Sequence, residues 1–140
     1  MINVQTRGIR NNNPLNIRVG NKWKHEKNSN DETQFEVFEE MKWGVRAGFM
    51  VLFRYITFYK CNTLRKIITR WAPPSENLTD SYLYAVGSKT YIEYDEKIDY
   101  KDKPKMCSIA YWMVYVENGV NIDIRTIEEG YDLAFADYKP

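Results

Sequence analysis

The chain has 140 residues, of which 44% are hydrophobic and 15% aromatic, so it is long enough for one domain with an apolar core. Its formal net charge of +1 excludes the strong overall field of a polyanion-binding protein. Two cysteines and a single histidine exclude a cysteine-rich or histidine-rich zinc site, and no metal or cofactor is predicted.

The first third of the chain is predicted to be irregular with a small sheet. Residues 11–14 have the composition of a turn. Residues 16–19 and 22–25 flank Gly20-Asn21 and are predicted to pair as a tight β-hairpin, with residues 33–38 as a candidate third strand.

Charge is unevenly distributed over this region. Residues 1–30 hold six lysines and arginines against one acid, Glu26, whereas residues 31–40 hold five acids. A basic lip beside an acidic strip suits an anionic polymer substrate, and it is equally the pattern of a solvated surface.

The pattern then changes to helix. Apolar residues recur at helical spacing from Val45 to Tyr59 and predict a long buried helix over residues 41–60. Asn62 or Thr63 is predicted to cap a second helix, which ends before Pro73-Pro74.

Three more helices are predicted in the second half of the chain. The first spans residues 80–86, capped by Thr79 and ended by Gly87. The second spans residues 104–117, and the third spans residues 124–138 with five inward side chains: Ile127, Tyr131, Ala134, Phe135 and Tyr138. The predicted fold class is mainly α (α+β): a helical bundle with a small N-terminal β-hairpin or three-stranded sheet in one domain, residues 1–140.

Glu117 is the candidate general acid. It lies four residues after Met113 and seven after Ala110, so it continues the apolar face of its predicted helix, which Asn118-Gly119 end. Burial and the negative end of the helix dipole both disfavour a charged carboxylate and favour a proton donor for a glycosidic oxygen. The alternative is an exposed glutamate at a frayed helix end.

Other residues are candidates for supporting roles. Glu26 and Glu32 could each supply a second acid, although a lytic transglycosylase needs none, because the sugar's own hydroxyl attacks the anomeric carbon. The candidates for substrate binding have amide or aromatic side chains: Asn12, Asn13, Asn16, Trp23, Tyr82 and Asn118. The alternatives are solvated loop charges, local turn hydrogen bonds and core aromatics. Trp43 and Trp71 are predicted to pack inside.

Several segments in order along the chain resemble a phage-associated, lysozyme-like family. They are the run RGIRNNNPLNIR at residues 7–18, the spaced Trp23, Phe35 and Phe38, residues 44–47, the run WAPPSEN at residues 71–77 with Thr79 and Tyr82, and Glu117-Asn118-Gly119. The resemblance implies a lysozyme-like fold and a virion or lysis protein of a phage or prophage.

A looser resemblance links the chain to glucosaminidase and lytic transglycosylase domains. In glucosaminidase domains an Asn-Asn-x-x-x-Ile segment precedes a hairpin and a long helix, as residues 12–17 do here. There the catalytic glutamate precedes the asparagine pair, whereas this chain has no acid before residue 26. A circular permutation that moves the catalytic helix to the C-terminal side, ending at Glu117, is the hypothesis that reconciles the two orders.

These observations predict cleavage of peptidoglycan glycan strands by a muramidase, glucosaminidase or lytic transglycosylase type of enzyme. The alternative is a non-catalytic virion or cell-wall-binding protein with the same shape. A nucleic-acid-binding module ranks last, because the basic residues do not follow one helix. Residues 1–10 lack the apolar segment of a signal peptide and no stretch is long enough to span a membrane, so synthesis in the cytoplasm and delivery to the wall by a virion or holin-type release are expected.

Overall fold

The computed structural model describes residues 5–28, 31–75 and 78–140, and these residues form a mainly α-helical fold, which confirms the helical part of the prediction. The helices are α1 (Arg7–Arg10), α2 (Met41–Thr57), α3 (Leu64–Trp71), α4 (Thr79–Thr90), α5 (Lys103–Asn118) and α6 (Ile124–Asp137).

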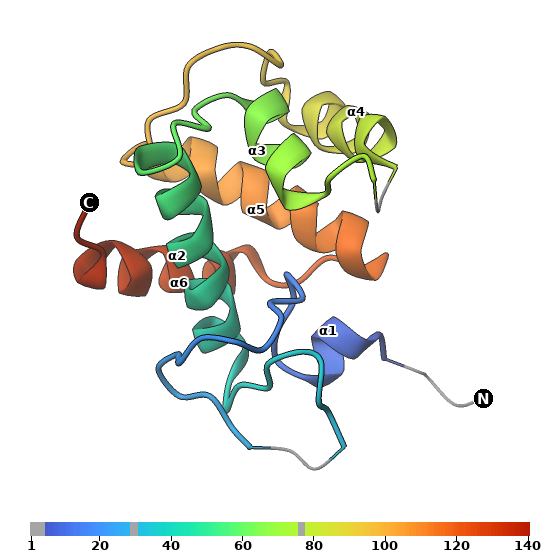
Figure 1. Ribbon diagram of the computed structural model, residues 1–140, viewed down its shortest axis with the longest axis vertical. Coiled ribbons are helices and arrows are strands. Elements are labelled where there is room, and N and C mark those ends of the chain that lie inside the picture. Colours follow the sequence, from blue (N-terminus) through green and yellow to red (C-terminus); the bar gives the residue numbers. More distant parts are fainter. Residues whose placement is uncertain (1–4, 29–30, 76–77) are drawn as a thin grey trace.

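Helix α2 runs along the long axis of the molecule and connects two regions (Figure 1). One region contains α3, α4 and α5, and the other contains α1 and the irregular segment up to residue 40. Helix α6 crosses α2 so closely that a Cβ on Gly130 would lie 2.3 Å from Cγ1 of Val45. The side chain of Phe49 on α2 is fully buried there, with its ring 5.3 Å from that of Tyr131 on α6.

The predicted N-terminal β-hairpin and three-stranded sheet are wrong. The described residues contain only two isolated antiparallel bridges, Arg18 with Phe35 and Glu26 with Phe38. Both bridges pair the region of residues 33–38 with an earlier segment, and neither pairs residues 16–19 with residues 22–25. Asn16 and His25 have left-handed φ values of 54° and 58°, which turn the chain where a hairpin needs extended residues.

The ends of two helices differ from their prediction. Helix α2 stops at Thr57 rather than residue 60, and Lys60 takes a left-handed φ of 59°. Helix α4 continues past Gly87, which is buried within it, and ends at Thr90 because Tyr91 supplies the left-handed capping conformation. Thr79 is the first residue of α4 rather than its cap, and its hydroxyl donates to the carbonyl of Ala72.

Several side chains predicted to face inward are more exposed than expected, among them Tyr59, which is 41% exposed, and Trp43, which is half-buried. Phe135 on α6 is 43% exposed, because α6 buries only the narrow face that meets α2 and α5. Trp71, the last residue of α3, is half-buried at the surface of the molecule rather than inside it. The cap of α3 is as expected, since the Thr63 hydroxyl accepts a hydrogen bond from the Lys66 amide.

Candidate active site

Glu117 lies in the last turn of α5, where the helix runs out beside the N-terminal segment. Gly119 ends the helix in a left-handed conformation with φ of 73°, which glycine adopts without strain. The Glu117 side chain is half-buried, so it is neither sealed in the core nor free in solvent.

Three side chains from different parts of the chain bond the Glu117 carboxylate. Asn16 Nδ2 donates to Oε1 at 2.9 Å, and the Tyr82 hydroxyl donates to Oε2 at 2.9 Å. Trp71 Nε1 makes a longer contact of 3.4 Å with Oε2. The carboxylate is therefore held in one orientation by the N-terminal segment, α3 and α4 together.

Tyr82 stays protonated as a hydrogen-bond donor to this carboxylate. Its side chain is buried, and this burial together with the neighbouring Glu117 charge raises its pKa well above the usual range for tyrosine. A hydroxyl that keeps its proton at all working pH values can position Glu117 without competing for the proton.

The residue after Glu117 fastens the N-terminal segment to the end of α5. Asn118 is buried, its Oδ1 accepts from the Thr6 hydroxyl at 2.7 Å, and its Nδ2 donates to the Pro14 carbonyl at 2.7 Å. Gly8 on α1 lies against the same amide, since a Cβ there would be 2.6 Å from Asn118 Oδ1. This close approach brings Asn16 to Glu117, and any larger residue at Gly8 would push the two segments apart.

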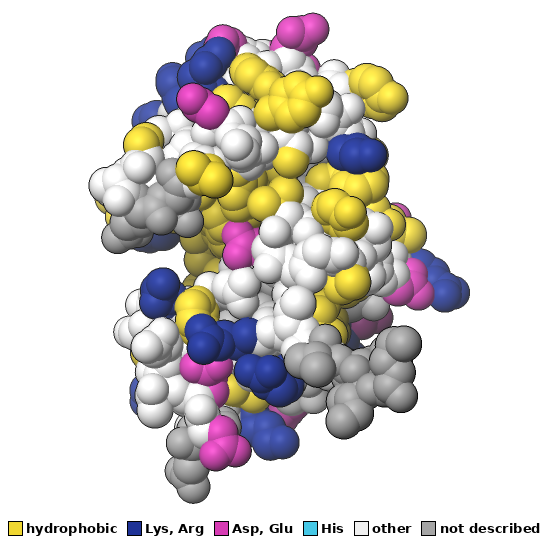
Figure 2. Space-filling view, turned by 90° about the vertical axis from the view of Figure 1, so that its right-hand side faces the viewer, with side chains coloured by type: hydrophobic (Ala, Val, Ile, Leu, Met, Phe, Trp, Pro, Cys, Tyr) yellow, Lys and Arg dark blue, Asp and Glu magenta, His cyan; other side chains and the backbone are white. Residues whose placement is uncertain are grey.

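A cleft of about 360 Å³ lies in front of Glu117, between α2, α3 and the N-terminal segment. Its apolar and aromatic walls include Ile17, Phe35, Val51, Tyr55 and Trp71. Figure 2 shows a hollow lined with hydrophobic side chains between the two regions, with basic side chains gathered on the region below it. The volume is at the lower end of the range for small-molecule sites, enough for a short part of a polymer.

Two charged side chains line this cleft. Glu117 is the only acid among the described lining residues, and Arg18 is the only cation among them. The Arg18 guanidinium lies 4.7 Å from the centre of the Phe35 ring, so it is held at the rim by a cation–π contact. The cleft can thus offer one proton-transferring group and one partner for a negative group on a ligand.

The structure separates the four predicted asparagine ligands. Asn16 lies in the cleft, half-buried. Asn13 is fully buried and its amide bonds the backbone of Ile17 and Glu36, so it cannot touch a ligand. Asn12 Nδ2 donates to the Phe38 carbonyl, and Asn118 is occupied as described above. These three amides serve the fold, because irregular backbone needs side-chain partners that regular structure does not.

The two candidate second acids lie outside the cleft lining. Glu32 accepts hydrogen bonds from the Asn11 side chain and from two backbone amides, and the Asn11 amide foremost lowers its pKa. Glu26 neighbours Glu36 instead, and burial together with Glu26 raises the pKa of Glu36 to about 7. Trp23 packs half-buried against the core rather than in the cleft. None of these positions supports the role predicted for them in this site.

Several cleft residues were not predicted as site residues from the sequence. Trp71 was expected in the core, and Tyr55, Arg18 and Phe35 were not named as site residues. The sequence did hold a signal for Trp71, the first residue of the run at residues 71–77. It stands directly before Ala-Pro-Pro, and because prolines end a helix, its side chain had to lie at a helix end. Glu76 and Asn77 of that run lie outside the described residues.

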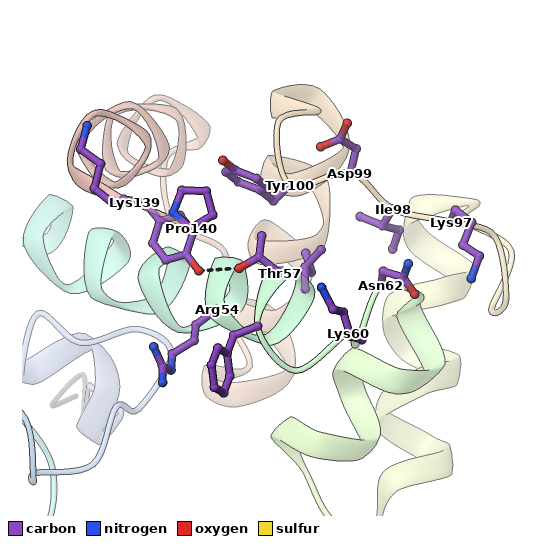
Figure 3. Close-up of a pocket in the computed structure, with 13 residues that line it drawn as sticks. Arg54, Thr57, Lys60, Asn62, Lys97, Ile98, Asp99, Tyr100, Lys139 and Pro140 are labelled. Carbon is purple, nitrogen blue, oxygen red and sulfur yellow. Dashed lines mark hydrogen bonds between the residues drawn. The ribbon is translucent and has the colours of Figure 1, made fainter.

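Other features of the described surface lie away from Glu117. A larger hollow of about 730 Å³ lies on the other side of α2 near Lys60, Ile98 and Tyr100 (Figure 3) and does not include Glu117. Within the described residues, no group of three or more His, Cys, Asp or Glu side chains is arranged to hold a metal ion. None of the described helices combines the length and apolarity needed to cross a membrane.

Comparison with known proteins gives one relative over nearly the whole length. The chain is 36% identical over 139 residues to Protein P5 of Pseudoalteromonas phage PM2, an alignment that covers 96% of this chain and 85% of the phage protein. No protein-family model matches the chain.

Proposed function

We propose that this chain, which belongs to the family of Protein P5 of Pseudoalteromonas phage PM2, serves a phage by cleaving the glycan strands of bacterial peptidoglycan. The observation that supports this most is the placement of Glu117. A half-buried carboxylate at a helix end, held by three side chains, faces a cleft with aromatic walls.

The proposed reaction uses Glu117 first as an acid and then as a base. The protonated carboxyl group gives its proton to the glycosidic oxygen, and the bond from that oxygen to the anomeric carbon breaks. A hydroxyl of the same sugar then attacks the anomeric carbon and returns its proton to the Glu117 carboxylate. The products are a free sugar hydroxyl and an anhydro sugar, and no water is consumed.

The composition of the cleft favours this lytic transglycosylase chemistry over hydrolysis. A hydrolase needs a second carboxylate to activate water or to form a covalent intermediate. Among the described residues that line the cleft, Glu117 is the sole carboxylate. An attack by the sugar's own hydroxyl needs only one group, which can carry the proton in both steps.

The three partners of Glu117 are positioning residues in this proposal. Asn16 and Tyr82 each donate to one carboxylate oxygen, so together they fix its plane toward the cleft. All three contacts are donated to the carboxylate, which suits the form that takes the proton back. The Trp71 ring also forms part of the wall on which a sugar face can stack.

The central experiment compares the parent with Glu117→Gln on purified peptidoglycan. We expect the release of soluble fragments to fall by about 10²- to 10⁴-fold in the variant, because general acid–base catalysis is lost. Glu93→Gln, at an exposed position, is the matched control and should release fragments like the parent. Mass spectrometry should find anhydro sugar ends rather than reducing ends in the products.

The second candidate function is a non-catalytic virion or cell-wall-binding protein. The same comparison separates the two: a folded parent that binds peptidoglycan but releases nothing would favour the binding protein. Equal release by the parent and Glu117→Gln would remove Glu117 from the mechanism.

A further inference from the structure

We propose that a row of aromatic and arginine side chains beside the cleft forms a second binding region for the same glycan strand, through the sugar faces and the carboxylates that the strand carries. This row, called here the α2–α3 stack, consists of Tyr55, Arg70, Tyr59, Arg54 and Phe58. The inference rests on the proposed function for its ligand, but its binding can be measured separately.

The side chains of the α2–α3 stack alternate between rings and guanidinium groups. Arg70 Cζ lies 5.2 Å from the centre of the Tyr55 ring and 3.6 Å from that of Tyr59. Arg54 Cζ lies 5.7 Å from the centre of the Tyr59 ring and 4.4 Å from that of Phe58. Each guanidinium thus contacts two rings, and Tyr59, the middle ring, contacts both guanidiniums.

The outer part of the stack is open to solvent. Phe58 is 62% exposed and Tyr59 is 41% exposed, and both arginines are exposed as well. Neither arginine makes an ion pair with a carboxylate of the described residues. The stack thus presents rings and guanidinium groups together on one solvent-exposed surface, where a ligand can reach both.

The stack continues the candidate active site without a break. Tyr55 lines the cleft together with Trp71, and the centres of their rings are 6.1 Å apart. Trp71 in turn reaches Glu117. A ligand that leaves the cleft past Trp71 therefore meets Tyr55 and then the rest of the stack.

At its other end the stack enters the hollow of about 730 Å³. Arg54 and Phe58 line this hollow, and so do three lysines, Lys60, Lys97 and Lys139 (Figure 3). Asp99 is the only acidic side chain among its described lining residues, so cations predominate there. The stack thus joins a small cleft with a carboxylate to a wider hollow rich in positive charge.

The chemistry of this path fits a glycan strand that bears acidic groups. The 360 Å³ cleft holds only a short part of a polymer, so the remainder of a strand must run along the surface. Rings offer flat apolar faces to sugars, while guanidinium groups pair with carboxylates in a bidentate manner. A single-stranded nucleic acid would also suit rings and arginines, but the continuity with the Glu117 cleft favours the glycan.

The test measures binding apart from cleavage. In the Glu117→Gln background, the double substitution Arg54→Ala/Phe58→Ala is compared with Arg125→Ala/Tyr84→Ala, which removes an exposed arginine and an exposed ring elsewhere. In a co-sedimentation assay with purified peptidoglycan, we expect the dissociation constant of the stack variant to rise about tenfold and that of the control to stay unchanged. Thermal melting confirms that both variants fold.

Three outcomes would overturn the proposal. The first is equal binding of peptidoglycan by the stack and control variants. The second is a Glu117→Gln parent that does not bind peptidoglycan. The third is a parent that binds an oligothymidine more tightly than peptidoglycan and a stack variant that no longer binds the oligothymidine. The two proposals fail separately. If the parent cleaves peptidoglycan and the stack variant binds it unchanged, only the proposal for the stack is refuted. If the stack variant binds more weakly but the parent cleaves nothing, only the proposed catalytic function is refuted.

Discussion

The described part of residues 41–140 is held together by apolar side chains, whereas the described part of residues 5–40 adds amide side chains that bond the backbone to a few buried apolar side chains. In the first region the inner faces of α2, α5 and α6 share one core, with Phe49, Met113 and Ile127 fully buried. In the second region the bonds of Asn12 and Asn13 supplement scattered backbone hydrogen bonds where a sheet was predicted. The Glu117 cleft lies where the two regions meet.

The difference shows how a short irregular segment can adopt one defined conformation, as a helix bundle does. Buried backbone groups need partners, and this irregular segment takes some of them from side chains in addition to those it takes from other backbone groups. Each amide then has a single correct place. Four predictions test how far this division between an apolar and a polar region holds.

The largest effect is expected from the apolar region. Phe49→Ala removes a fully buried ring between α2 and α6 and should lower the free energy of unfolding by about 4 kcal/mol. Chemical denaturation followed by circular dichroism measures it. Phe135→Ala, at a 43% exposed position, should cost far less; similar losses for both would contradict a core centred on α2 and α6.

The next effect concerns the polar region. Asn13→Ala leaves the Ile17 amide and the Glu36 carbonyl without their partner and the Ile17 carbonyl with the Glu36 amide alone, and we expect a loss of about 3 kcal/mol. Hydrogen exchange should show lost protection in residues 5–40 first. Asn21→Ala, at an exposed position, is the control; equal stability of the two variants would show that the amide contacts do not hold this region.

A smaller effect should depend on pH. Glu36 is buried, and burial and Glu26 raise its pKa to about 7 in the folded protein. The folded state then holds a proton that the unfolded state has released, so stability should fall by about 2 kcal/mol from about pH 5 to pH 8.

Glu36→Gln isolates this contribution, since its side chain cannot ionise. The variant should lose much less stability than the parent over the same pH range in thermal melts, whereas Glu93→Gln should follow the parent. A parent whose stability does not change between pH 5 and pH 8 would show that Glu36 is already ionised in the fold.

The smallest effect returns to the helical region. Thr63→Ala removes the hydroxyl that caps α3 and should cost about 1 kcal/mol, while Thr63→Ser should cost little because it keeps the cap. Denaturant titration of both variants tests this. If Thr63→Ser loses as much stability as Thr63→Ala, the methyl group that both variants lack stabilises this position rather than the cap. The helical region would then depend on apolar contacts even at the ends of its helices.

Prediction from sequence succeeds where the signal is local. The apolar spacing from Val45 to Tyr59 predicts α2, and the inward positions Ile127 and Ala134 predict the buried face of α6, because both follow from helical periodicity alone. The end of α4 was missed because a glycine is a frequent helix stop, and here Tyr91 takes that conformation instead.

Prediction fails where contacts are distant and polar. Asn13 and Asn16 stand three residues apart in one polar run, yet one is sealed under the backbone of Glu36 and the other touches Glu117. The left-handed φ of Asn16 decides which amide faces the cleft, and local composition does not encode it. Glu117 itself could be singled out because it continues an apolar face. Tyr82 on α4 was predicted to bind substrate and Trp71 on α3 to pack inside, and neither contact with Glu117 was foreseen, since it depends on how the helices pack.

The positions of the two chain ends have a practical consequence for producing the protein. Thr6 bonds the residue next to Glu117, and Pro140 lines the basic hollow, while the start of α1 and the C-terminal end lie on opposite sides of α2 (Figure 1). A tag fused before Thr6 is therefore added ahead of a residue that bonds Asn118, and one fused after Pro140 adjoins the hollow at the outer end of the α2–α3 stack. Assays of cleavage and of strand binding should use material from which the tag has been removed, or compare both tag placements.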